Sequence, residues 1–74
     1  MKLSAEVSGT EGEAEVLIYA DREGLDYLLT QLGHLARTDH VHLFAPAWGG
    51  GDLTEETHVA SAIPVRHIKI MNVS

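Results

Sequence analysis

One stripe of apolar residues constrains this chain more than any other feature. Asp21 is suited to cap a helix with its carboxylate, and Glu23 and Asp26 favour the positive end of the helix dipole. Arg37 suits the last turn, where a positive charge is favoured. Gly24 in the first turn lowers helix stability by about 1 kcal/mol relative to alanine, which indicates close packing against a sheet. Between Asp21 and Arg37, apolar residues follow helical spacing at positions 25, 28, 29, 32, 35 and 36. The sequence therefore predicts a single amphipathic helix whose apolar face must be buried.

Four segments alternate apolar and polar residues as strands do, and they span residues 2–8, 14–20, 40–45 and 65–73. The first two form a hairpin around the glycine turn at 9–12, with Val16 and Ile18 expected on the side that faces the helix. Pro46 ends the third strand. The order predicts an α+β fold, a two-layer ββαββ arrangement with the helix packed on a sheet of about four strands. Residues 1–74 form a single domain.

One helix can cover only one face of such a sheet. The alternation leaves eight side chains on the opposite face, too apolar and aromatic for a purely hydrated surface: Leu17, Tyr19, His40, His42, Phe44, His67, Lys69 and Met71. We expect this face to be covered by a second copy of the chain, by a partner protein, or by the long loop that carries Trp48. A homodimer is among these expectations because a small core without cysteines has no disulfides to support it.

The charge of the chain narrows the class of partner. The formal net charge of −6 disfavours nucleic acids and anionic membranes, which bind clustered Lys and Arg. It suits a basic protein partner, although solubility alone is an equally good explanation. No segment reaches the roughly 20 apolar residues that span a bilayer, and the absence of an export signal makes the cytoplasm the expected location.

The sequence offers little for catalysis or metal binding. His40 and His42 lie roughly 6.5–7 Å apart on one face of a strand, a spacing that suits zinc, and His67 is a conceivable third ligand. No fourth ligand is apparent, so we expect no metal and no cofactor, and a pH-sensitive surface fits these histidines better. There is no cysteine and no nucleophile elbow, and Gly49–Gly51 lacks the ending of a phosphate loop and indicates flexibility. We expect a protein that is not an enzyme.

The remaining candidate residues suggest a binding surface. Trp48 in a loop can anchor an interface or fold back on the core, and the sequence leaves both open. The acids near it can form a patch for a basic partner or simply be hydrated. We therefore predict partner-binding residues at Asp39, His40, His42, Phe44, Trp48, Asp52, Glu55 and Glu56.

A family resemblance makes this expectation more specific. The helix opens with Arg22-Glu23-Gly24-Leu25, and His40-Val41-His42-Leu43 follows it, then a loop that leads to Leu53-Thr54 and a final strand. This order, over about residues 16–54, resembles immunity protein family thirty-two of bacterial polymorphic toxin systems. The resemblance implies a protein that binds and neutralises a cognate toxin. The alternative is a small homodimeric regulatory or assembly module without catalytic activity.

Overall fold

The computed structural model describes residues 1–10 and 12–73, so Glu11 of the predicted turn lies outside the described residues. The elements confirm the α+β class, with one α-helix, two 3-10 turns (η1 and η2) and antiparallel strands. In chain order they are β1 (Leu3–Ser8), β2 (Glu15–Ala20), α1 (Arg22–Gly33), η1 (His34–Ala36), β3 (His40–Phe44), η2 (Pro46–Trp48), β4 (Ile63–Pro64) and β5 (His67–Met71).

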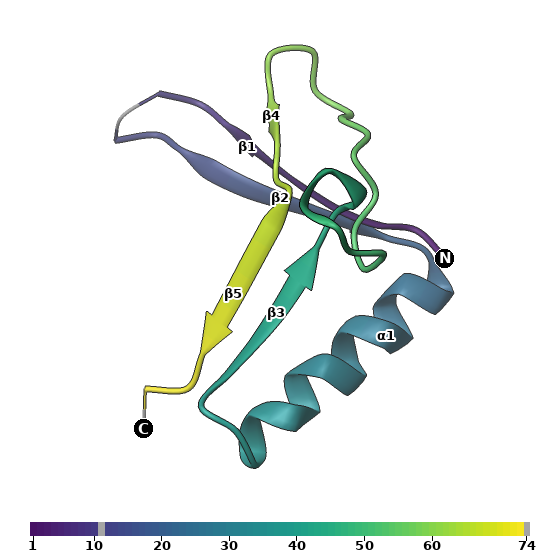
Figure 1. Cartoon of the computed structure of the whole chain (residues 1–74). Helices are drawn as coiled ribbons and strands as arrows, with labels where there is room; N and C mark the ends of the chain where they lie inside the picture. Colours follow the sequence, from purple (N-terminus) through teal and green to yellow (C-terminus); the bar gives the residue numbers. More distant parts are fainter. Residues whose placement is uncertain (11, 74) are drawn as a thin grey trace.

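The strands divide between two sheets instead of forming the one sheet that the alternation suggests. One sheet has the order β2-β1-β4 and the other pairs β3 with β5. The predicted last strand, residues 65–73, contains β5, whereas β4 lies just before it in a segment expected to be irregular. The C-terminal part of the chain pairs first with β1 and then with β3. At the crossing, the Val65 N–H donates to the Ala5 carbonyl (2.8 Å) and the Arg66 carbonyl accepts from the Ala45 N–H (2.9 Å). Pro64 has no N–H to extend the first ladder, and the chain bends after it (Figure 1).

The start of α1 confirms two local predictions. The Asp21 carboxylate accepts a hydrogen bond from the Gly24 N–H at 2.7 Å, as a helix cap should. A Cβ atom at Gly24 would lie 1.9 Å from the Lys2 carbonyl oxygen, so close packing against β1 explains the glycine. The prediction for the other end is wrong, because α1 stops at Gly33 and tightens into η1, which leaves Arg37 beyond the last turn.

The core lies where α1, β1 and β3 meet. Leu3, Leu43, Ala45 and Leu53 are almost fully buried, and Tyr27, Leu28 and Ile68 pack against them. The α-helix continues directly from β2 and runs along β3, away from the hairpin (Figure 1).

This course leaves part of the predicted core exposed. Val16 and Ile18 lie on the core face of the sheet, as expected, but α1 does not cover them, and they are 63% and 55% exposed. The leucine stripe is also only partly buried, since Leu25, Leu29 and Leu32 remain exposed.

The other face of the three-stranded sheet is covered by the chain's own loop. The Glu6 carboxylate, 1% exposed, accepts hydrogen bonds from the backbone N–H groups of His58 and Val59 at 3.0 and 3.2 Å. Burial opposes ionisation of Glu6, but these hydrogen bonds prevail and hold its pKa below the ordinary value. The Tyr19 ring stacks on His58 at 3.9 Å between centroids. Loop coverage, one of the three expected possibilities, therefore applies to the part of the predicted bare face that belongs to β2.

Candidate partner-binding surface

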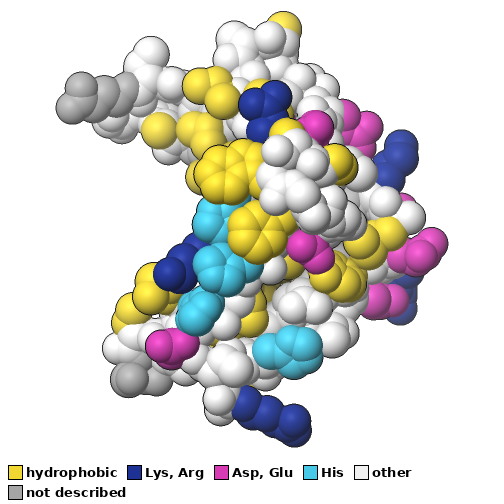
Figure 2. Space-filling view, in the orientation of Figure 1, with side chains coloured by type: hydrophobic (Ala, Val, Ile, Leu, Met, Phe, Trp, Pro, Cys, Tyr) yellow, Lys and Arg dark blue, Asp and Glu magenta, His cyan; other side chains and the backbone are white. Residues whose placement is uncertain are grey.

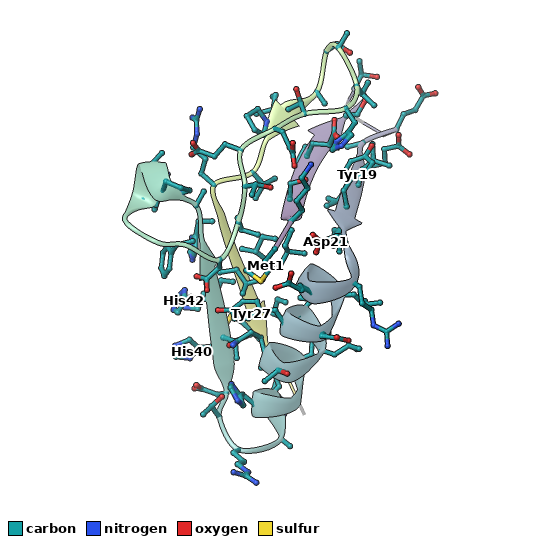
Figure 3. All side chains as sticks on the ribbon, turned by 90° about the vertical axis from the view of Figure 1, so that its right-hand side faces the viewer. Met1, Tyr19, Asp21, Tyr27, His40 and His42 are labelled. Atoms are coloured by element: carbon teal, nitrogen blue, oxygen red, sulfur yellow. The ribbon has the colours of Figure 1, made fainter. Side chains whose placement is uncertain are left out.

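The outer face of the β3–β5 sheet is the part of the predicted bare face that stays uncovered by the described chain. Strand alternation places His40, His42 and Phe44 on the same side of β3. The register sets them opposite Met71, Lys69 and His67 of β5, in that order. Figure 3 shows His40 and His42 pointing away from α1, which lies on the other side of β3.

Five rings on this face form a continuous row, here called the aromatic stack: Trp48, His67, Phe44, His42 and His40. Ring centroids are 5.5 Å apart for Trp48 and His67, and 4.6 Å for Phe44 and His67. His42 stacks on Phe44 at 5.3 Å, and His40 meets the edge of His42 at 4.9 Å. Figure 2 shows the histidines side by side next to hydrophobic side chains on one face. Such a row of rings presents a flat, amphipathic surface with little side-chain entropy left to lose.

Trp48 sits at one end of the stack because a short turn holds it there. Pro46 opens η2, and Gly49 closes it with φ 84°, a conformation that favours glycine. A Cβ atom at Gly50 would lie 2.3 Å from the Phe44 Cβ, so two of the three glycines have a steric role. Trp48 is 61% exposed, and it therefore does not cap the core.

The histidines of the stack are electrostatically coupled. His42 Nδ1 and His67 Nε2 lie 2.8 Å apart, a hydrogen bond in which one ring nitrogen donates and the other accepts. This contact requires at least one neutral imidazole. Burial lowers the pKa of His42, and the charges of His40, His67 and Lys69 lower it further. Near neutral pH, His42 is therefore an uncharged member of the stack.

The structure does not collect the four predicted acids into one patch. Asp52 uses both carboxylate oxygens within the chain, since it accepts hydrogen bonds from the Tyr27 hydroxyl and from the Phe44 N–H. Glu55 pairs with Arg66 at 3.3 Å. Asp52 thus ties the loop to α1 and β3.

Asp39 lies away from Asp52, and Glu56 is engaged with its neighbour Thr54. Asp39 precedes β3, at the opposite end from Phe44, and its hydrogen bond with His40 (2.7 Å) lowers its pKa. The Glu56 carboxylate accepts from the Thr54 hydroxyl at 3.3 Å. The structure brings together His40, His42, Phe44 and Trp48 from the predicted set, with Asp39 at their edge.

The predicted set omits His67, the ring that connects Trp48 to Phe44. Its position two residues before Lys69 in an alternating segment already placed it on the same face. What the sequence does not give is the register, which sets His67 directly opposite Phe44.

Three further features of the described residues bear on the kind of site. Within 1–10 and 12–73, no three His, Cys, Asp or Glu side chains are grouped so as to hold a metal ion. A hollow over the loop-covered face is lined in part by Lys2, Tyr19 and His58, but Tyr19 and His58 are stacked on each other there. Among these same residues, no helix is long and apolar enough to cross a membrane.

Comparison with known proteins adds one finding. The family model described as Immunity protein 32 matches residues 15–65, which is 51 of the 74 residues. The match runs from β2 through α1 and β3 to the end of β4, and so includes Trp48 and three further members of the aromatic stack. No curated protein and no solved structure matches the chain. Because the match covers more than half of its length, the chain belongs to the Immunity protein 32 family.

Proposed function

We propose that this protein binds a cognate toxin through the aromatic stack and neutralises it without catalysis. The family supports a toxin-neutralising immunity role in general. The observation that carries the more specific proposal is the aromatic stack itself, which lies on the outer face of β3–β5 with Trp48 exposed at one end. Exposed aromatic side chains on a rigid sheet are typical anchors of protein interfaces.

The charge of the chain supports a basic toxin. A net charge of −6 attracts a positively charged partner over distances of about one Debye length, roughly 8 Å at physiological salt. At contact, the acids contribute less than the rings, because Asp52 and Glu55 are engaged within the chain. In this proposal the charge governs the rate of association, and the aromatic stack governs how long the complex lasts.

The test needs the toxin domain encoded beside this gene. Cells that express this domain should grow when they also produce the wild-type chain, and should grow poorly with Trp48→Ala. Loss of an exposed tryptophan anchor should cost about 2 kcal/mol or more, roughly a 30-fold rise in Kd by calorimetry with an inactivated toxin. Ile63→Ala is the matched control, because Ile63 is similarly exposed (67%) but lies on β4, outside the aromatic stack.

The proposed site is wrong if Trp48→Ala still protects the cells as well as the wild type and Ile63→Ala do. A gene neighbourhood without a toxin would remove the support for a cognate partner.

A further inference from the structure

The strand β2 is an apolar edge of the three-stranded sheet. It pairs with β1 on one side, and within the described chain no strand pairs with its other side. Its sequence from Glu15 to Ala20 contains no proline or lysine, and its only charge, Glu15, lies at the end. Natural proteins usually protect such edges with Lys, Pro or a covering segment, because exposed strand edges pair with other chains. β5 has this protection, since it carries Lys69.

The side chains of β2 also indicate that this edge lacks a cover. Val16 and Ile18 are 63% and 55% exposed, although both lie on the face of the sheet that forms the core. Ile18 pairs with Ala5, which is 1% exposed, and paired residues share a face. The core therefore stops before it reaches β2.

The exposed leucines of α1 border the same core from the helix side. Leu28 packs on the core, and Leu25, Leu29 and Leu32 flank it at helical spacing of three or four residues. We call these exposed residues of both elements the open core edge: Val16, Ile18, Leu25, Leu29 and Leu32.

The overall dimensions show how much surface lacks a cover. The accessible surface is 5109 Å² for 8.0 kDa, whereas a compact monomer of this mass exposes about 4,450 Å². The radius of gyration is 12.8 Å, against about 11.3 Å for a compact domain of this length. The molecule as a whole therefore exposes about 650 Å² more than a compact monomer of its mass, and the open core edge contributes to this excess.

Charge indicates which partner fits this surface. A basic toxin would favour acids, but all five side chains of the open core edge are uncharged. Two copies of a chain with net charge −6 repel each other least where they meet through uncharged surfaces. A second copy also presents a matching free edge, as a two-fold interface requires.

We propose that two copies of this chain form a homodimer by pairing β2 with β2 in antiparallel orientation. A two-fold axis through Ile18, perpendicular to the sheet, sets Ile18 opposite Ile18 and Val16 opposite Ala20. Both apolar faces then lie on the same side, and the three-stranded sheets join into a six-stranded one. The charges are confined to the two ends of the paired strands, where each Glu15 lies opposite Asp21 of the second copy. The aromatic stack belongs to the other sheet and stays available to the toxin.

Sedimentation velocity of the purified full chain tests the dimer. The wild-type protein should sediment with twice the 8.0 kDa mass of the chain, and Ile18→Lys should sediment as a monomer. Ile63→Lys is the matched control: Ile63 is 67% exposed on the same face but lies on β4, at the opposite edge, so this variant should remain a dimer. Circular dichroism establishes that each variant is folded.

Hydrogen exchange on the wild-type protein decides the matter even if Ile18→Lys does not fold. The β2 amides should become more protected as protein concentration rises through the dimer dissociation constant. A wild-type monomer at millimolar concentration would overturn the proposal. So would a dimer that survives Ile18→Lys but is lost in Trp48→Ala, because the contact would then lie on the β3–β5 face.

Discussion

Replacement of Gly24 by alanine should destabilise the protein, although alanine is the better helix former. In a helix interior, the exchange normally gains about 1 kcal/mol. Here the new Cβ would lie 1.9 Å from the Lys2 carbonyl oxygen and 2.8 Å from the carbonyl carbon. Both atoms belong to the backbone, so no side-chain rotation relieves the overlap.

The cost follows from what must move. The Lys2 carbonyl accepts a hydrogen bond from the Asp21 N–H at 3.0 Å, which joins the start of α1 to β1. Overpacking of this kind costs about 1–3 kcal/mol, and loss of the hydrogen bond adds about 1 kcal/mol. After the gain in helix propensity, we expect a net loss of about 2 kcal/mol. Since each kcal/mol lowers Tm by about 4–8 °C in a domain of this size, Tm should fall by roughly 8–16 °C.

Gly33→Ala is the matched control for this prediction. Gly33 has helical backbone angles (φ −61°, ψ −29°), and a Cβ atom there would meet nothing within 4 Å. This variant should gain up to about 1 kcal/mol. Urea unfolding followed by circular dichroism measures both variants, at one protein concentration because the proposed dimer would add to stability as concentration rises. If Gly24→Ala were as stable as the wild type, the close approach of α1 to β1 would not be what requires glycine.

Two further predictions concern stability. Leu43 is 1% exposed in the core, so Leu43→Ala should lower the free energy of unfolding in urea by about 2–5 kcal/mol. Val73 is 94% exposed, so Val73→Ala should change it by less than about 0.5 kcal/mol. Equal effects of the two substitutions would contradict the core described above. Glu6 faces His58 and Tyr19, and its pKa is lower in the folded protein than in the unfolded chain. Ionised Glu6 therefore stabilises the fold fully above the ordinary pKa of 4.5, and this stabilisation is lost as the pH falls through the lower pKa of the folded state. Glu6→Gln should therefore lose less Tm than the wild type between about pH 7 and pH 3, and an unchanged pH profile would refute this role.

The sequence predicts those features that depend on neighbouring residues. The Asp21 cap needs only the next helical turn, and the alternation of His40, His42 and Phe44 needs only the strand geometry. Both the start of α1 and the outer face of β3 could therefore be predicted from a few residues.

What the sequence does not predict depends on distant pairing. The division into two sheets arises because Glu6 pairs with Pro64, far along the chain, and no local pattern encodes that register. Leu53 is 2% exposed although it lies in an irregular loop, where periodicity gives no signal. The exposure of Ile18 also depends on distant pairing. Its apolar side chain predicts that it is buried, but the local pattern does not show which element would bury it.

The passage of one C-terminal segment from β1 to β3 has a consequence for how the molecule holds together. Residues 63–71 form the only strand-to-strand link between the two sheets in the described chain, so each sheet loses a strand when this segment detaches. Neither half has a second strand to substitute for it. Opening of this end of the chain should therefore spread through the whole molecule, which couples the aromatic surface to the hairpin and makes unfolding a single concerted event.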